Sequence, residues 1–281
     1  MEENNILLPP TNYSGSKHKL IPQLIEYFPK EVDVFYDVFC GGLSVTMNTN
    51  YDKYISNDII TPLIGFYENI YKAAKNDTME SEIEKVLKYK LDKDSQEDYN
   101  KLRAEFNIDR DPYKFFSLVS SCTNNMLRFS QKLNFNQTWG KRTISDKTVE
   151  KIILYMERMK DKKIIFKNYN FNELVEKRFP SNNDFVYMDP PYIQTEAGYN
   201  SIWSKKMESD LFDLMKKLTD NNIKFAYSNV SIYKGVENPN MHIFKEYNII
   251  ELDHSYEKVA RNKGGDNQEI LITNYDNTTS N

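Results

Sequence analysis

The sequence predicts an α/β fold built from both ends of the chain, with a mostly helical insertion between them. Short apolar segments rich in β-forming residues alternate with helical patterns in residues 1–60 and 160–281, and such alternation is typical of an α/β sheet. Residues 63–108 instead carry long helical patterns of mixed charge. We therefore expect one α/β domain formed by residues 1–60 and 160–281, interrupted by a second domain of residues 61–159.

The individual elements follow from hydrophobic periodicity and from chain breakers. Residues 16–28 place their apolar side chains on one face of a helix. Gly41-Gly42 ends the first strand, and another helix begins at Leu43. Further helices are predicted within 63–108 and at 204–218, and strands at 32–39, 53–56, 163–166, 185–188, 223–227 and 269–274.

The bulk composition excludes several classes of protein. The chain has 281 residues, 40% of them hydrophobic, and a net charge of −4, which is ordinary for a folded domain and unlike a basic nucleic-acid coat protein. Cys40 and Cys122 form no CxxC motif, and the three histidines form no helical pair, so we expect no metal site and no disulfide.

There is no signal-peptide pattern, and no apolar run approaches the roughly 18 residues of a membrane span. We expect a cytoplasmic protein that binds no membrane.

The segment Phe39-Cys-Gly-Gly-Leu-Ser44 is the first motif that indicates a ligand. It reads as a strand, a glycine turn and a helix, and glycine lets the backbone approach a ligand closely. A tight turn without a ligand is the alternative. Asp58 follows the next strand, 17 residues after Gly41, where a carboxylate can accept hydrogen bonds from ribose hydroxyls. This spacing fits a nucleoside but not the GxGxxG pattern for a pyrophosphate, and it favours S-adenosylmethionine over NAD.

The motif Asp189-Pro-Pro-Tyr192, directly after the predicted strand 185–188, is the most specific in the chain. The two prolines fix φ and lack N–H donors, which leaves nearby carbonyls free to face a ligand. The Asp189 carboxylate and the Pro190 carbonyl offer two acceptors to one NH2 group, and Tyr192 can stack on the ring that carries it. The alternative is a proline-rich strand exit with a surface tyrosine.

This motif predicts methyl transfer to a planar amine. The N6 lone pair of adenine is delocalised into the ring, and two acceptors would favour a pyramidal amine and stabilise the positive charge that develops on it. The chain has no Pro-Cys dipeptide of the kind that a cytosine-C5 enzyme uses. A base inside a duplex cannot reach such a pocket, so the target must flip out of the helix.

The order of the motifs resembles that of a known family. Asn12-Tyr-Ser-Gly-Ser-Lys17, Phe39-Cys-Gly-Gly42, a central insertion and Asp189-Pro-Pro-Tyr192 resemble the D12-class, Dam-type adenine-N6 DNA methyltransferases, most closely the bacteriophage Dam enzymes. The resemblance implies a Rossmann-like, S-adenosylmethionine-dependent methyltransferase sheet with a mostly helical target-recognition insertion that carries a β-hairpin. It also implies an enzyme, a site-specific DNA methyltransferase specific for adenine.

The same resemblance assigns the cofactor site. Tyr13 would lie against the adenine of S-adenosylmethionine, Lys17 against its methionine part, and Asp58 would hold the ribose. Asn170-Phe171 matches a pair that is usually Asp-Phe, and a core position is the alternative for Phe171. The implied cofactor-binding residues are Tyr13, Lys17, Asp37, Phe39, Gly41, Gly42, Asp58, Phe171 and Asp189, and the implied catalytic residues are Asp189, Pro190, Pro191 and Tyr192.

Residues 112–145 contain no Asp or Glu and match the target-recognition region of the family. Arg128 would make a bidentate contact to guanine, with a phosphate contact as the alternative. The usual target of the family is GATC. Many relatives carry Pro-Phe where this chain has Thr138-Trp139, so an outer base pair of the target is expected to differ. The implied DNA-binding residues are Asn124, Asn125, Met126, Arg128, Asn136, Thr138, Lys141 and Arg142, of which the last two would clamp phosphates.

Two other functions stay open at this point. The motif could serve another planar amine, in cytosine N4, RNA or a protein glutamine, although Asp189 favours adenine over cytosine and the Asn-rich, basic insertion favours duplex DNA. The chain could also bind DNA without catalysis. The main hypothesis gives double-stranded DNA as partner, a cognate restriction endonuclease as a further candidate partner, and a monomer or weak dimer on DNA inside a bacterial or phage-infected cell.

Overall fold

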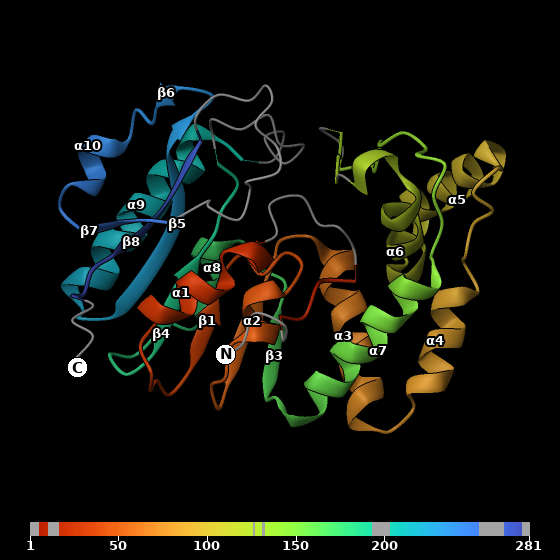
Figure 1. Ribbon diagram of the computed structural model, residues 1–281, viewed down its shortest axis with the longest axis horizontal. Helices are drawn as coiled ribbons and strands as arrows, with labels where there is room; N and C mark the ends of the chain where they lie inside the picture. Colours follow the sequence, from red (N-terminus) through yellow and green to blue (C-terminus); the bar gives the residue numbers. More distant parts are fainter. Residues whose placement is uncertain are drawn as a thin grey trace.

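One sheet organises the chain, of which the computed structural model describes residues 6–10, 17–125, 127–130, 133–192, 203–252 and 267–276 (Figure 1). Its strands are β1 (Phe35–Asp37), β2 (Tyr54–Asn57), β3 (Ile164–Lys167), β4 (Phe185–Met188), β5 (Lys224–Tyr233), β6 (Val236–Glu237), β7 (Asn248–Glu251) and β8 (Gln268–Thr273). They lie in the order β3-β2-β1-β4-β5-β8-β7, with β6 paired to β5. The strands from β3 to β5 in this order are parallel, and β8 is antiparallel to both of its neighbours.

Helices cover both faces of the sheet. They are α1 (Ile21–Tyr27), α2 (Ser44–Asn48), α3 (Thr61–Lys75), α4 (Met79–Leu87), α5 (Gln96–Asp109), α6 (Pro112–Ser121), α7 (Asp146–Asp161), α8 (Phe171–Lys177), α9 (Lys205–Asp220) and α10 (Met241–Phe244), with short 3-10 turns η2 (Lys17–Lys19) and η3 (Thr123–Asn125). α1, α2 and α3 share one hydrophobic cluster with the sheet, whereas α8, α9 and α10 share the other. Within the described residues no helix is long and apolar enough to cross a membrane.

The central strand β4 shows why the sheet is buried on both faces. Phe185 and Tyr187 belong to the cluster under α1 and α2, while Val186 and Met188 belong to the cluster under α8 and α9. All four side chains are buried. A continuous apolar run is the pattern of a parallel strand with helices on both sides, and burial on both faces fixes the register of the strand that leads into Asp189.

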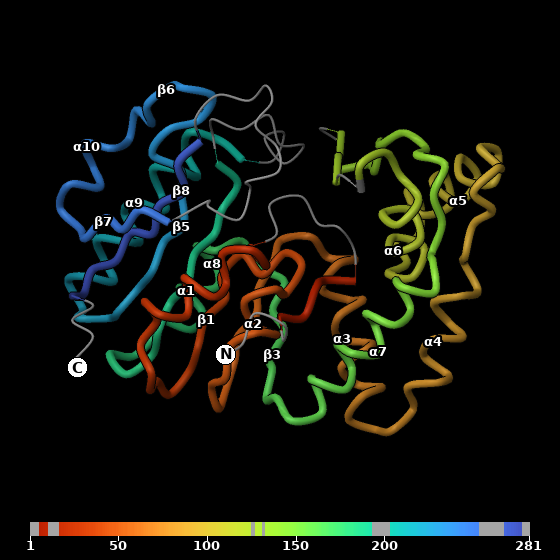
Figure 2. The backbone as a smooth tube through the Cα atoms, in the orientation of Figure 1, coloured from red at the N-terminus to blue at the C-terminus, as the bar shows by residue number. Residues whose placement is uncertain are grey.

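The predicted α/β fold with a helical insertion is confirmed. α3 to α7 all lie between β2 and β3 in the chain and form the part of the molecule beside β3 (Figures 1 and 2). Hydrophobic side chains of α5 and α6, such as Phe106 and Phe115, belong to the same cluster as Phe35 and Phe185 of the sheet. The core therefore runs without a break from the sheet into the insertion.

Several elements differ from the sequence-based expectation. The first strand covers three residues rather than 32–39, because the chain turns into the glycine loop directly after Asp37. The segment 112–145 was predicted only as a basic recognition region, yet it begins with α6, whose apolar face packs into the core. β7 and α10 were not predicted, since β7 is mostly exposed and α10 is only four residues long.

A paired segment follows α6 and supplies the predicted hairpin of the insertion. Cys122 and Trp139 form an antiparallel bridge, as do Phe129 and Phe135. Gly140 N donates a hydrogen bond to the Ser121 carbonyl at 2.9 Å. A Cβ atom at residue 140 would lie 2.5 Å from both the carbonyl carbon and the oxygen of Cys122, so the close approach of the two chains requires glycine.

We expect Gly140→Ala to destabilise the protein by about 3 kcal/mol, because backbone atoms cannot move aside as a flexible side chain can. Gly235→Ala is a matched control, since a Cβ there meets nothing within 4 Å and only its φ of +76° opposes the substitution. That control should cost about 1 kcal/mol. Denaturant unfolding of both variants tests the ranking, and equal costs would show that the two segments tolerate a wider separation.

Candidate active site

Three aspartates gather at the carboxyl edge of the parallel strands. Asp37 ends β1, Asp58 directly follows β2, and Asp189 directly follows β4. β2, β1 and β4 are parallel neighbours, so their carboxyl ends meet at the edge where open α/β sheets bind ligands. The two motifs found in the sequence therefore belong to one site.

The glycine loop after β1 is fixed by hydrogen bonds of its own backbone. Cys40 N donates to the Asn57 carbonyl at 2.8 Å, and Leu43 N donates to the Cys40 carbonyl at 2.7 Å. Gly41 and Leu43 adopt left-handed conformations with φ of 43° and 59°. This conformation is uncommon for leucine, and the fully buried Leu43 side chain anchors it in the core.

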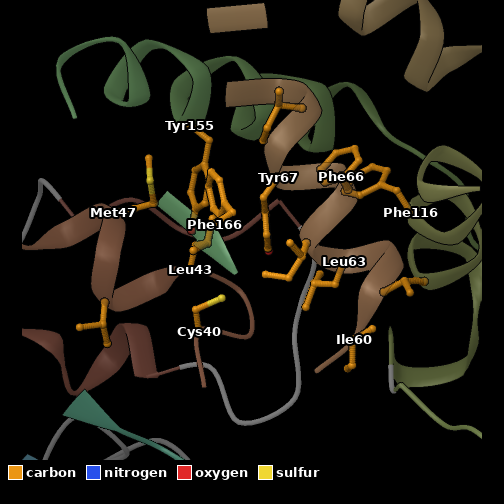
Figure 3. Packing of buried hydrophobic residues seen from close by; sticks show 14 of the residues in the cluster. Cys40, Leu43, Met47, Ile60, Leu63, Phe66, Tyr67, Phe116, Tyr155 and Phe166 are labelled. Atoms are coloured by element: carbon orange, nitrogen blue, oxygen red, sulfur yellow. The ribbon is translucent and has the colours of Figure 1, made fainter. Parts of the chain in front are cut away.

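Helix α7 of the insertion also holds this loop. The Tyr155 hydroxyl donates a hydrogen bond to the Gly42 carbonyl at 3.1 Å. Figure 3 shows Tyr155 together with Leu43 of the loop and Phe166 of β3 in the same cluster of buried side chains. The geometry of the glycine loop thus depends on Tyr155, which lies 113 positions away from Gly42 in the sequence. No local sequence pattern marks Tyr155 as part of the site.

Asp58 clamps the glycine loop from the side of β2. Its Oδ2 accepts a hydrogen bond from Gly41 N at 3.1 Å, and its Oδ1 accepts one from Ile60 N at 2.9 Å. Burial raises the pKa of Asp58 to about 6. A carboxylate has about four acceptor positions, so each oxygen keeps a lone pair for a ligand hydroxyl. Asp58, the predicted acceptor of the ribose hydroxyls, therefore also stabilises the glycine loop.

Asp37 lies deeper than Asp58 and is almost fully buried. The Thr46 hydroxyl of α2 donates to its Oδ2 at 2.7 Å. Burial raises the pKa of Asp37 to about 7; the hydrogen bond from Thr46 opposes this shift, and the nearby charges of Asp189 and Asp58 contribute to it. A carboxyl group that titrates near neutral pH beside a ligand site is typical of a functional position.

Lys17 of η2 brings a positive charge into this acidic edge. Its Nζ lies 3.0 Å from Asp189 Oδ1 and 3.9 Å from Glu269 Oε2, and 4.6 Å from the centre of the Tyr192 ring. The side chain is only 7% exposed. Burial opposes its charged form, yet the charges of Asp189 and Glu269 outweigh burial and raise the pKa of Lys17.

Asp189 is held through one of its two oxygens. Lys17 Nζ and the Tyr192 hydroxyl both contact Oδ1, at 3.0 and 3.2 Å. Among the described residues these are its side-chain contacts, so Oδ2 is left for a ligand. Burial raises the pKa of Asp189, while Lys17 lowers it. Pro190 is buried, and Pro191 and Tyr192 are half-buried at the same edge.

An aromatic cluster lies next to the glycine loop. The rings of Phe39, Phe171 and Trp203 lie 5.6 to 5.8 Å apart, centre to centre. Phe39 is half-buried and the other two are buried. Trp203 was not among the predicted site residues, although it directly precedes the capping residue Ser204 of α9. Asn170 caps α8, and its side chain accepts a hydrogen bond from Asn172 N. Asn170, which stands where the family usually has Asp, can therefore cap this helix.

The described residues among those predicted to bind DNA lie on the paired segment of the insertion or directly after it. The described side chains of Asn124, Arg128, Thr138, Lys141 and Arg142 are exposed. Asn136 is half-buried, and its Oδ1 has no hydrogen-bond partner among the described residues. Tyr13, Met126 and the side chain of Asn125 lie outside the described residues.

The fold and the site together define a class of protein, a Rossmann-like enzyme whose acidic, aromatic site lies at the carboxyl edge of its parallel strands. The model of the D12 class N6 adenine-specific DNA methyltransferases matches residues 13–257. This chain belongs to that family, and the family predicted from its motifs is confirmed.

Individual relatives agree with this assignment. The chain is 32% identical to the type II methyltransferase M.FokI of Planomicrobium okeanokoites, over 98% of this chain and 44% of that protein. It is 26% identical to the type II methyltransferase M1.LlaDCHI of Lactococcus lactis subsp. cremoris, over 99% of both. It is 27% identical to the DNA adenine methylase of Serratia marcescens, over 71% of both. The chain thus spans less than half the length of M.FokI, and the likeness to bacteriophage Dam enzymes stays a prediction.

We expect Asp37→Asn to change how stability depends on pH. The pKa of Asp37 rises from 3.8 to about 7 on folding, so between these values the folded protein holds a proton that the unfolded chain releases. The stabilisation by this proton is complete below about pH 4 and is lost as the pH rises toward 7. Asn keeps an acceptor for Thr46 but does not titrate.

The free energy of unfolding of the wild type should therefore fall relative to that of the variant, by up to roughly 4 kcal/mol between pH 4 and 7. Denaturant unfolding at a series of pH values measures the difference. Parallel curves for the two proteins would show that Asp37 titrates at its ordinary pKa.

Proposed function

We propose that this chain transfers a methyl group from S-adenosylmethionine to the N6 amine of adenine in duplex DNA. The observation that carries the proposal is the position of Asp189 directly after β4, with Oδ1 held by Lys17 and Tyr192 and Oδ2 left for a ligand. Family membership supports the same chemistry. The proposal also assigns residues 1–60 and 160–281 to catalysis and 61–159 to target recognition.

The residues at the carboxyl edge fit S-adenosylmethionine. Asp58 has lone pairs for ribose hydroxyls, it lies beside the glycine loop, and the half-buried ring of Phe39 offers a surface for an adenine. When bound, S-adenosylmethionine supplies a methyl group on a positively charged sulfur, which a nitrogen lone pair can attack.

Asp189 and Pro190 activate the amine in this proposal. Asp189 Oδ2 and the Pro190 carbonyl each accept one N–H of the amine, which draws its lone pair out of conjugation with the ring. The nitrogen lone pair then forms the new bond to carbon, and the electron pair of the broken carbon–sulfur bond stays on sulfur. The nitrogen becomes positively charged before it loses one proton, and the adjacent carboxylate stabilises that charge.

Tyr192 and the insertion would deliver the target base. A base in a duplex must leave the stack to reach Asp189, and the ring of Tyr192 can stack on it once it has flipped. The exposed side chains of the hairpin, Arg128 among them, would read the sequence in the major groove. The proposed target is GATC or a closely related site.

Methyl transfer from labelled S-adenosylmethionine tests the proposal. Three duplexes are compared: one with GATC, one with that site scrambled, and one with GATC already N6-methylated. Label only in the first supports both adenine chemistry and the target. Label in the scrambled duplex would support methyl transfer to DNA at a site other than GATC. No label in any duplex would favour another amine as substrate or a DNA-binding protein without catalysis.

We expect Asp189→Asn to lower the rate of transfer at least about 100-fold, because an acceptor of the amine is replaced by a neutral group that can donate. Binding of S-adenosylmethionine, followed by calorimetry, should change little. Asp77→Asn is the matched control, since Asp77 pairs with Lys160 at the surface. A near-wild-type rate for Asp189→Asn would show that this carboxylate does not contact the amine.

We expect Arg128→Ala to weaken discrimination at one base pair by about 1–3 kcal/mol, as for a lost bidentate contact to guanine. Lys141→Ala provides the contrast, because loss of a phosphate contact weakens binding to all sequences alike and lowers the salt dependence of binding. Binding of the two variants to duplexes with single substitutions distinguishes these outcomes. If Arg128→Ala weakens all duplexes equally, Arg128 contacts a phosphate.

A further inference from the structure

Glu269 lies in the candidate active site, although neither motif contains it. β8 runs antiparallel to β5, so its first residues lie at the carboxyl edge of the sheet, and Glu269 pairs in register with Val230. The Glu269 side chain is 18% exposed, and it precedes the apolar run Ile270 to Ile272 in the same strand. A carboxylate at such a position needs partners that offset its desolvation.

Glu269 shares both of its partners with Asp189. Glu269 Oε2 accepts a hydrogen bond from the Tyr192 hydroxyl at 3.0 Å and lies 3.9 Å from Lys17 Nζ. The same hydroxyl lies 3.2 Å from Asp189 Oδ1, and the same ammonium lies 3.0 Å from it. Lys17, Asp189, Tyr192 and Glu269 therefore form one group, called here the Lys17 cluster.

The Tyr192 hydroxyl carries one proton and can donate it to only one carboxylate at a time. Glu269 is the nearer acceptor, at 3.0 Å against 3.2 Å for Asp189. A hydrogen bond to Glu269 holds the tyrosine ring in place while Lys17 holds Asp189 Oδ1. The stacking surface and the amine acceptor are then fixed by separate partners.

Glu269 also sets the charge of the cluster. Lys17 and Asp189 alone would form a neutral ion pair, whereas the second carboxylate leaves an excess of one negative charge beside the amine pocket. The amine nitrogen becomes positively charged during transfer, and the low dielectric of a buried site strengthens its attraction to that charge.

We propose that Glu269 is a positioning residue for methyl transfer, which holds the Tyr192 hydroxyl and shares the Lys17 ammonium so that Asp189 Oδ2 and its charge serve the target amine. The inference rests on the proposed function, because it assigns a role in that reaction. It adds a residue from outside the Asp189-Pro-Pro-Tyr192 motif to the site.

Glu269→Gln, Tyr192→Phe and the double variant test this role, with Glu251→Gln on the neighbouring strand β7 as matched control. Single-turnover rates are measured on the duplex that the wild type methylates. Glu269→Gln should lower the rate about 10- to 100-fold, as for a lost hydrogen bond to a charged group, while the KM for S-adenosylmethionine stays within about twofold of the wild type. In the Tyr192→Phe background the same substitution should cost clearly less, because the two residues act together.

A second readout follows the flipped base directly. With 2-aminopurine at the target position, Glu269→Gln should give brighter emission than the wild type, because a less well held Tyr192 ring stacks on the flipped base less closely. Tyr192→Phe should show the same trend, and Glu251→Gln should match the wild type. This binding measurement does not require methyl transfer by the variants.

Two results would overturn the role of Glu269: a Glu269→Gln rate within about twofold of the wild type, or the same factor of loss with and without the Tyr192 hydroxyl. If Glu269→Gln does not fold, Tyr192→Phe alone decides, since a rate and emission equal to the wild type would show that the hydroxyl bond has no function. A wild-type protein that methylates no DNA would instead overturn the proposed function itself, and this inference with it.

Discussion

The buried ion pair between Lys17 and Asp189 is the interaction on which the acidic edge of the sheet depends. Parallel strands necessarily bring their carboxyl ends together, and here three of those ends carry an aspartate. Burial and repulsion between like charges both favour protonation of these carboxyl groups, and burial is the larger cause of the raised pKa of Asp37. Lys17 offsets this repulsion at Asp189, the proposed acceptor of the target amine. A residue from the beginning of the chain is therefore part of the site at residue 189.

The insertion is connected to the sheet by packing of side chains as well as by the backbone. Its helices share one hydrophobic cluster with the sheet (Figure 3), and the Tyr155 hydroxyl donates a hydrogen bond to the Gly42 carbonyl of the glycine loop. The proposed reaction needs such a connection, because it places a flipped base beside a fixed acceptor and an error of about 1 Å in position is costly for catalysis. The insertion is thus positioned relative to the sheet by a shared core.

The sequence predicted the features of the site that lie within one strand and the turn after it. The apolar run before Asp189 and the glycines after β1 could be recognised because strand, turn and ligand group are contiguous. Glu269, Trp203 and Tyr155 could not, since each acts through partners that only the tertiary structure brings near. An acidic residue at the start of an apolar strand was the one local signal for Glu269. The boundary near residue 60 was drawn from composition, which does not show that the core continues across it.

The aspartates at the carboxyl edge and the side chains of the hairpin differ in how tightly the surrounding residues constrain them. Asp58 bonds to backbone amides on both sides, and Asp189 is tied to a buried lysine, so a change at either residue disturbs the groups around it. On the hairpin, Arg128 and Thr138 are exposed, and the described turn positions Leu133 and Lys141 adopt left-handed conformations at the surface. Side chains of that kind can be exchanged without repacking a core. In the proposed division of roles, the DNA sequence that is read can therefore change while the methyl-transfer site is kept.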